Sequence, residues 1–362
     1  GLGNFSRYIV EILSEFYPDN TYLLFAPKKK PNNRLATILS RHNIAFVFPK
    51  GIFRLFSSLW RVWGIKKDIR KQAIAVFHGL SNELPVGIEQ TGIKTVVSIH
   101  DLIFLRYPEY YKSFDRAIYR RKFKRACEKA DKIVAISECT KRDIVSFFLI
   151  SEEKINVIYQ SCHPVFKEKV PEEKKQIVVE KYSLPSRFLL YVGSIESRKN
   201  LLLAVKALKQ LPEDIHLVAI GKSTPYQSKV EAYAQKSGLE SRLHIKNAFP
   251  FEDLPAVYQL SELFIYPSFF EGFGIPIVEA LMSEIPVIAA TGSCLEEAGG
   301  PDSIYINPDD DTELAQKITA VLNDKTLAQK MIESGKKYAK RFSDKEIASE
   351  MMAVYQSLIS PT

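Results

Sequence analysis

Two series of short apolar segments, separated by one charged stretch, constrain the fold of this 362-residue chain more than any other feature. The segments are rich in β-branched or aromatic residues, and amphipathic stretches of helical pattern lie between them. The first series is TYLLFA, IAFVF, AIAVF, KTVVSI, DKIVAI and INVIY, and the second is RFLLYVG, IHLVAIG, RLHIKN, ELFIYPS, PVIAA and SIYIN. Strands joined through helices need crossover connections, so the pattern predicts mostly parallel sheets covered by helices on both faces.

The charged stretch FKEKVPEEKKQ at 166–176 marks the predicted boundary between two doubly wound α/β domains. We expect a first domain at 1–168 and a second at 169–341. The remaining segment, 342–362, is expected to form a helix that closes the second domain or crosses back to the first. Ser343 and Glu346 fit a capping box at the start of this helix.

The opening GLGN resembles a glycine turn between a strand and a helix, although no strand stands before it. We therefore expect the first strand to precede Gly1 and the helix to begin near Phe5. In such a turn, Gly1 and Gly3 would let the backbone meet a phosphate or a sugar, but a lone GxG is a weak signal.

Composition is that of an ordinary soluble globular protein, with 46% hydrophobic and 25% charged residues. No apolar run approaches the roughly 18–20 residues of a membrane-spanning helix. The four cysteines show neither a CxxC pair nor metal-ligand spacing. They are typical of reduced, buried thiols, which indicates a cytoplasmic protein.

Positive charge is concentrated in the first half. Residues 1–170 contain 29 Lys and Arg against 16 Asp and Glu, whereas the remainder contains 21 against 26. This asymmetry indicates an anionic partner for the first half, such as phosphate, nucleic acid or a lipid surface. The basic stretches match no recognised nucleic-acid-binding module, so nucleic acid is not expected.

The segment GIFRLFSSLWRVWGIKKDIRK, residues 51–71, combines Trp60, Trp63 and several Phe residues with many cations. Such a composition suits contact with an anionic membrane surface. It equally suits an ordinary amphipathic helix whose aromatic side chains pack inward.

Polar motifs follow two predicted strands of the second half. SIESRKN follows RFLLYVG, and Asn200 is a plausible N-cap for the apolar helix after it. Arg198 and Lys199 would then lie beside unpaired backbone N–H groups, where two cations suit a diphosphate. The alternative is a solvated turn, because adjacent Arg and Lys are common on surfaces.

The second motif, FFEGFG, follows ELFIYPS and precedes a helix with Pro276 near its first position. Gly272 and Gly274 allow unusual φ angles and close approach of a ligand to the backbone. Glu271 can accept hydrogen bonds from the hydroxyls of a polyol, and Glu279 from a diol such as that of ribose. The alternative is a glycine loop with a solvated Glu279.

The first half contributes histidines at strand ends. His100 and Asp101 end the strand KTVVSI, and His78 ends AIAVF. A lone histidine at a strand end is more often structural than catalytic. Here both lie where parallel strands would open onto a ligand cleft.

These pieces, in this order, resemble glycosyltransferase family 4. YVGSIESRKN, NAFPFEDLPAVYQLSELFIYPSFFEGFGIPIVEALMSEIPVIAA and GSCLEEAGGPDSIYINPDD resemble its donor-binding half, and SIHDLIF, VAISECTKRDI and HGLSNELP its acceptor half. The resemblance covers most of residues 1–341 and is strongest to the bacterial mannosyltransferase-like group of envelope polysaccharide synthesis. It implies a GT-B fold, in which two Rossmann-like domains face each other across a cleft.

The resemblance further implies a retaining hexosyltransferase that needs no metal and no other cofactor. Its donor would be a nucleotide-sugar, GDP- or UDP-linked, with mannose from GDP-mannose as the first expectation. Its acceptor would be a glycan or a lipid-linked glycan, which would bring a cytoplasmic protein to the inner membrane face.

Site residues follow from the resemblance in the same way. Glu271 would hold sugar hydroxyls, Glu279 the ribose, and Arg198 with Lys199 the departing diphosphate. His100 would lie near the transferred sugar, and His78 and Asp101 in the acceptor cleft. The rest of the donor set would be Gly3, Ser194, Ala248, Phe249, Gly272, Phe273, Gly274 and Ile275. The sequence departs from the family at four positions. Ser194 stands where the family commonly has arginine, and Ser161, Asn247 and Glu284 stand where it commonly has glycine.

Two other functions fit parts of the pattern. A nucleotide-sugar epimerase could share the GT-B fold, although the EGFG and SRKN loops argue against it. A non-catalytic protein that binds carbohydrate or an anionic surface would account for the basic first half.

Overall fold

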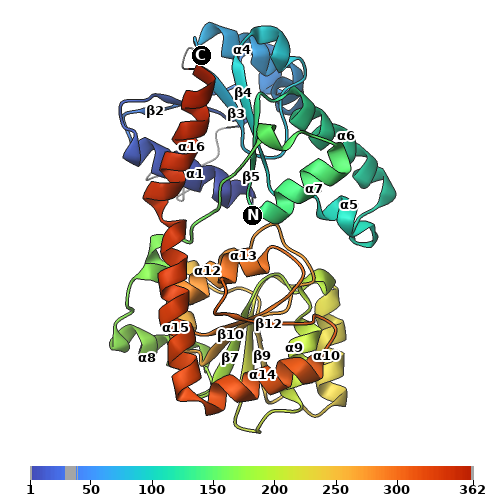
Figure 1. Ribbon diagram of the computed structural model, residues 1–362, viewed down its shortest axis with the longest axis vertical. Helices are drawn as coiled ribbons and strands as arrows, with labels where there is room; N and C mark the ends of the chain where they lie inside the picture. The colour runs from blue at the N-terminus through green and yellow to red at the C-terminus, as the bar shows by residue number, and fades with distance from the viewer. Residues whose placement is uncertain (1, 29–37, 39, 360–362) are drawn as a thin grey trace. The chain divides into compact units, whose positions relative to one another are not determined.

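The structure is a computed structural model that describes residues 2–28, 38 and 40–359 (Figure 1). The chain divides into two compact units, one comprising Gly1–Gln160 with Ser343–Thr362 and the other Ser161–Phe342. The division lies upstream of the charged stretch at 166–176, which belongs to the second unit. The C-terminal segment belongs to the first unit.

Parallel strands form two sheets in the described part of the first unit. β1 (Tyr22–Phe25) pairs with β2 (Ile44–Val47). A four-stranded sheet has the order β3-β4-β5-β6, so consecutive strands are neighbours. Its strands are β3 (Val76–Gly79), β4 (Lys94–Ile99), β5 (Lys132–Ala135) and β6 (Ile155–Val157).

Helices of the first unit connect these strands and cover the sheet. They are α1 (Leu2–Phe16), α3 (Ser57–Leu59), α4 (Ile65–Lys71), α5 (Ile103–Arg106), α6 (Ser113–Lys129), α7 (Glu138–Phe148) and α16 (Asp344–Ile359). α16 packs beside α1 and against β3 and β4. The Glu346 N–H donates to Ser343 Oγ over 3.3 Å, as predicted for the cap of this helix.

The glycine turn predicted at GLGN is wrong for Gly3. α1 begins at Leu2, so Gly3 lies exposed in the first helical turn and not in a loop that ends near Phe5. The reason is the strong amphipathic pattern of this stretch, whose apolar side chains Phe5, Ile9 and Leu13 are all buried.

The second unit is built on one six-stranded parallel sheet. Its order is β12-β11-β10-β7-β8-β9, so the chain adds strands on one side of β7 and then returns to add the others on the opposite side. This order is that of the doubly wound Rossmann fold. The strands are β7 (Phe188–Val192), β8 (His216–Ile220), β9 (Leu243–Lys246), β10 (Leu263–Tyr266), β11 (Val287–Ala290) and β12 (Ile304–Ile306).

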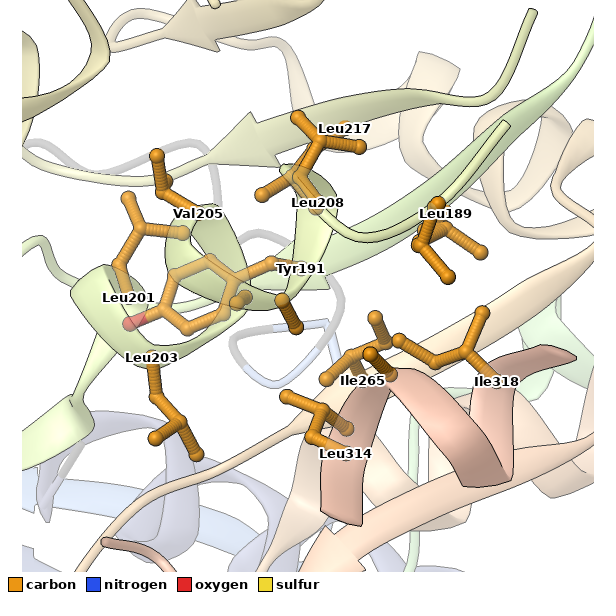
Figure 2. Packing of buried hydrophobic residues seen from close by; sticks show 14 of the residues in the cluster. Leu189, Tyr191, Leu201, Leu203, Val205, Leu208, Leu217, Ile265, Leu314 and Ile318 are labelled. Atoms are coloured by element: carbon orange, nitrogen blue, oxygen red, sulfur yellow. The ribbon is translucent and has the colours of Figure 1, made fainter. Parts of the chain in front are cut away.

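A helix follows each strand of this sheet, as the sequence predicts, and one further helix precedes the first strand and another follows the last of these helices. They are α8 (Glu172–Tyr182), α9 (Leu201–Leu208), α10 (Tyr226–Lys236), α11 (Leu254–Leu260), α12 (Ile275–Met282), α13 (Leu295–Gly299), α14 (Asp311–Asn323) and α15 (Lys325–Ala339). Figure 2 shows how strand and helix side chains form the core. Buried residues of this core include Leu189, Tyr191, Leu201, Val205, Leu208, Leu217, Ile265, Leu314 and Ile318.

Each of the predicted apolar segments contains or overlaps a strand of the structure. Among the described helices, none is long and apolar enough to cross a bilayer.

Candidate active site in the second unit

The order of the six-stranded sheet reverses between β7 and β10. In open parallel sheets, ligands bind outside the carboxyl ends of the strands at such a reversal point. The loop after β7 carries SIESRKN, and the loop after β10 carries PSFFEGFG. The two motifs singled out from the sequence therefore lie side by side at the position where this fold takes its ligand.

Direct hydrogen bonds join the two loops. The Phe269 N–H donates to the Arg198 carbonyl over 2.9 Å. Asn200 has a left-handed backbone, with φ of 55°, and its Nδ2 donates to the carbonyls of Pro267 (3.2 Å) and Pro308 (2.7 Å). Asn200 stands at the predicted N-cap position, but its side chain ties loops together and does not cap α9.

Glu271 lies at the centre of a cluster of four donors. Its Oε2 is 3.1 Å from Arg198 Nη1, and its Oε1 is 3.0 Å from Lys199 Nζ. Oε1 also accepts hydrogen bonds from Ser268 Oγ (2.9 Å) and Tyr266 Oη (3.2 Å). Burial favours the neutral acid, but the Lys199 and Arg198 cations outweigh it and lower the pKa of Glu271 to about 2.

Arg198 is held on more than one side. Its Nη2 donates to Glu196 Oε1 over 2.7 Å, and its Nη1 donates to the Phe270 carbonyl. Burial disfavours the charged guanidinium, but Glu271 and Glu196 outweigh it and raise the pKa of Arg198. Arg198 is therefore a permanent cation whose orientation is fixed before any ligand binds.

Lys199 is oriented through Tyr266, a fully buried residue at the end of β10. Lys199 Nζ donates to Tyr266 Oη over 2.8 Å, and Tyr266 in turn donates to Glu271. The lysine side chain lies against Gly193, where an added Cβ would come within 3.1 Å of Lys199 Cδ. Sequence reasoning missed Tyr266, although its place at a strand end beside FFEGFG was a usable signal.

The glycine loop is shaped mainly by Gly274. Its φ is 132°, and an added Cβ would lie 3.1 Å from Ala298 Cβ, so a side chain would be strained here. Gly272 was expected to share this freedom, but it has no positive φ. Pro276 lies in the first turn of α12, as predicted.

A buried thiol, that of Cys294, contacts two backbone carbonyls of the same loop. Cys294 Sγ lies 3.0 Å from the Glu271 carbonyl oxygen and 2.9 Å from that of Phe273, so its one S–H is shared between these two acceptors. The sequence offered no signal for this contact, because Cys294 is more than twenty residues downstream and follows a different strand.

Glu279 projects from α12 and is partly buried. Tyr258 Oη donates to Glu279 Oε2 over 2.8 Å. Burial raises the pKa of Glu279 to about 7, although the Tyr258 hydrogen bond opposes the shift. Two carboxyl groups of one site thus differ widely in pKa. Glu271 is ionised at neutral pH, whereas the pKa of Glu279 lies close to 7.

Three other predicted residues flank these loops. Ser194 follows β7, and its carbonyl accepts from Tyr191 Oη over 3.3 Å. Phe249 lies in the loop after β9, with its ring centroid 4.2 Å from that of Tyr182, and its neighbour Ala248 is exposed.

The remaining predicted residues belong to the first unit, where His78 and His100 are neutral. His100 Nε2 is 2.9 Å from the Leu80 carbonyl, so this nitrogen carries the proton. His78 Nδ1 is 2.6 Å from Tyr355 Oη, and its Nε2 is 2.9 Å from Ser98 Oγ. Burial lowers the pKa of His100 to about 4 and that of His78 to about 3.

Asp101 has a local structural contact. Its Oδ1 accepts from the Ile103 N–H over 3.2 Å at the start of α5. Gly3, in α1, is likewise a residue of the first unit.

Comparison with known proteins identifies the class. The structure is similar to that of a glycosyltransferase from Rickettsia africae, with a TM-score of 0.78 at 19% sequence identity. The match covers 98% of this chain and 95% of the Rickettsia chain. WaaG, a glycosyltransferase involved in lipopolysaccharide biosynthesis, matches over 100% of this chain and 96% of its own, with a TM-score of 0.71 at 17% identity. These likenesses establish the GT-B fold.

Family matches cover both units. Residues 172–338 match "Glycosyl transferases group 1", and residues 6–162 match "Glycosyltransferase Family 4". The chain therefore belongs to glycosyltransferase family 4.

Relatives with assigned functions point to one group within the family. The O-antigen chain mannosyltransferase B of Escherichia coli is 26% identical over 314 residues, which is 84% of this chain and 79% of that protein. The serotype-specific mannosyltransferase WbdA of E. coli is 29% identical over 269 residues, 71% of this chain but only 33% of that longer protein. RfbU of Salmonella typhimurium, an O-antigen chain mannosyltransferase, is 25% identical over 59% of this chain and 57% of its own.

Proposed function

We propose that the chain transfers mannose from GDP-mannose to a glycan or lipid-linked glycan in bacterial envelope polysaccharide synthesis. The observation that carries this proposal is the pair of fixed cations, Arg198 and Lys199, at the point where the parallel sheet reverses. The mannosyltransferase names of the relatives support the choice of sugar. A UDP-linked donor is the alternative, because the related structure of Anabaena HepE contains UDP and glucose.

In this proposal, Arg198 and Lys199 bind the diphosphate of the donor. Negative charge develops on the phosphate oxygen as its bond to the anomeric carbon breaks, and two preorganised cations stabilise that charge. Their position supports a reaction without a metal ion or other cofactor.

Sugar and nucleoside would contact the neighbouring residues. Glu271 accepts from the sugar hydroxyls, and the backbone from Gly272 through Phe273 and Gly274 to Ile275 lies along the sugar and phosphate. Glu279 accepts from the ribose diol, and Ser194, Ala248 and Phe249 border the phosphate and the base. For the first-unit residues His100, Gly3, His78 and Asp101, the roles that the family resemblance implies stay predictions.

Retention of configuration is part of the proposal. The acceptor oxygen forms its bond to the anomeric carbon on the face from which the phosphate leaves, and the leaving phosphate takes the acceptor's proton. No side chain need act as a nucleophile. The environment of Glu271 supports this. Its carboxylate is already contacted by four donors, which include the Lys199 and Arg198 cations that lower its pKa to about 2, and a carboxylate of such low pKa is a weak nucleophile.

Localisation would follow from the acceptor. A lipid-linked acceptor at the inner membrane face would make this a cytoplasmic enzyme that associates peripherally with the bilayer.

The test incubates the protein with GDP-mannose or with UDP-hexoses and a mannose-containing glycan acceptor in excess EDTA. The proposal expects an α-linked product from an α-linked donor, detected by the anomeric NMR signals, with full activity in EDTA. An inverted product, a strict metal requirement, or epimerised sugar without transfer would each overturn it.

A further inference from the structure

The segment Gly51–Lys71 presents two apolar faces, only one of which is covered. It runs through a 3₁₀ turn (Gly51–Arg54), α3, a π turn (Trp60–Gly64) and α4. The inward face packs in the core of the first unit through Trp60, Ile65 and Ile69, with Phe53 packed against that core. Trp60 Nε1 donates to Asp68 Oδ2 over 2.7 Å, which ties the two halves of the segment together.

The outward face is apolar as well, and it is exposed. It consists of Ile52, Leu55, Phe56, Leu59 and Trp63, whose side chains are between 52% and 82% exposed. Phe56, Leu59 and Trp63 are spaced by three and four residues along the helical run that starts at Ser57, which puts them on one side of it, and Ile52 and Leu55 lie in and just after the preceding 3₁₀ turn. We call these five residues the apolar stripe. Five large apolar side chains exposed within twelve residues indicate an interaction surface.

Positive charge borders the apolar stripe. Within residues 50–71 the cations are Lys50, Arg54, Arg61, Lys66, Lys67, Arg70 and Lys71, and Asp68 is the one acid. Seven cations against one acid leave the segment strongly positive, and the acid, Asp68, accepts the hydrogen bond from Trp60 Nε1.

A second basic element lies beside the segment. Arg61 Nη2 is 3.0 Å from Glu83 Oε1, and Lys122 of α6 pairs with the other oxygen of the same carboxylate. On α6, Ile118 and Phe114 are exposed one and two turns before Lys122, respectively. The helix also carries Arg120, Arg121 and Lys124.

We infer that the apolar stripe inserts into the interface of an anionic bilayer, with the bordering cations on the lipid headgroups. Aromatic and aliphatic side chains above a basic border are the pattern of helices that lie in the plane of a membrane. Charge complementarity selects this occupant over a second copy of the chain, because two such surfaces would repel each other. The inference rests on the proposed function only in that a lipid-linked acceptor would bring the enzyme to a bilayer.

Intrinsic fluorescence provides a direct probe, because Trp60 and Trp63 are the two tryptophans of the chain. Trp60 is buried and Trp63 is 61% exposed, so a blue shift on adding vesicles reports on Trp63. We expect a blue shift, and quenching by brominated lipid, with vesicles of phosphatidylglycerol and phosphatidylethanolamine. Both should disappear in Trp63→Phe, a variant that retains the apolar contact.

Sedimentation with the same vesicles tests the rest of the surface. Leu55→Ser should weaken partitioning by about tenfold or more, as expected for withdrawing one leucine side chain from an apolar phase. Leu149→Ser is the matched control, because Leu149 is 85% exposed in the same unit but lies outside the segment. Lys67→Gln should weaken binding to anionic vesicles, and raising salt from about 0.1 M to about 1 M should weaken it further.

Several outcomes would overturn the inference. They are no binding to anionic vesicles, equal binding to pure phosphatidylcholine, or equal loss in Leu55→Ser and Leu149→Ser. A dimer that Leu55→Ser dissociates, without vesicle binding, would assign the stripe to a second copy instead. Calorimetry with nucleotide-sugars on the same proteins separates this inference from the proposed function, since either can fail while the other holds.

Discussion

Lys199 and Glu271 form an ion pair of 3.0 Å between two loops that follow neighbouring strands of one parallel sheet. The pair lies where the strand order reverses, and Tyr266 contacts both partners. The lysine is thus oriented without a ligand, so little reorganisation is needed when phosphate charge develops.

Replacing Lys199 tests this preorganisation. Lys199→Ala should lower kcat by about 100-fold or more while weakening donor binding far less, because the cation stabilises charge that appears mainly in the transition state. Steady-state kinetics and donor calorimetry measure the two effects. Lys209→Ala, an exposed lysine of the same unit, should leave both unchanged. A loss confined to donor affinity would contradict the role.

Tyr266 should act as a positioning residue. Tyr266→Phe removes the hydroxyl between Lys199 and Glu271 but keeps the buried ring. We expect kcat to fall by about tenfold with nearly unchanged donor KM, as for the loss of one hydrogen bond that orients a charged group. Rates equal to those of the parent protein, with an intact fold by circular dichroism, would show that Lys199 is oriented without Tyr266.

Glu279 should make donor binding depend on pH. Its pKa is raised to about 7 by burial, and only the ionised carboxylate accepts from both hydroxyls of a ribose diol. Nucleoside diphosphate affinity should therefore rise as pH increases through about 7. Glu279→Gln should bind more weakly at high pH and lose the pH dependence, as measured by calorimetry. A parent protein with flat affinity across this range would refute the assignment.

The same group affects stability with the opposite sign. Because the pKa of Glu279 is raised above the ordinary value of 4.5, the folded state binds more protons than the unfolded state between the two values. The stability contributed by protonated Glu279 is present below about pH 4.5 and is lost as pH rises through about 7. Glu279→Gln should thus gain relative stability from low to high pH in thermal melts. A constant difference between the variant and its parent would contradict the raised pKa.

Glu284 occupies a backbone conformation that favours glycine. Its φ is 62°, two residues after the end of α12, where family members often carry glycine. Its side chain pairs with Lys336 over 2.6 Å, but both groups are largely solvated, so the pair contributes little. Glu284→Gly should be more stable by about 0.5 kcal/mol or be neutral. Denaturant unfolding measures this, with Lys336→Ala isolating the ion pair, and a marked loss in Glu284→Gly would be the contrary result.

The strands were predictable because a parallel strand buried on both faces is a continuous apolar run. The position of the two motif loops followed, since each stands directly after such a run. The structure adds what local sequence cannot specify, namely which side chains meet across the fold. Tyr258 reaches Glu279 from another helix, and Cys294 reaches the Glu271 carbonyl from another loop.

For 51–71 the sequence left two interpretations open, and the structure divides the aromatic residues between them. Trp60 packs inward, as in the ordinary amphipathic helix, whereas Trp63 is exposed. Periodicity alone could not have separated these two tryptophans, because residues three apart lie on the same side of a regular helix.

The most direct test of the central claim is calorimetric titration of the protein and of Glu279→Ala with GDP, UDP and ADP and their common sugar conjugates. If the loops at the strand reversal form the donor site, one nucleoside diphosphate should bind with one-to-one stoichiometry. Its affinity should fall by about tenfold or more in Glu279→Ala, since a buried hydrogen-bonding partner of the ribose is lost. Binding of none of these nucleotides, or equal affinity in both proteins, would contradict the account.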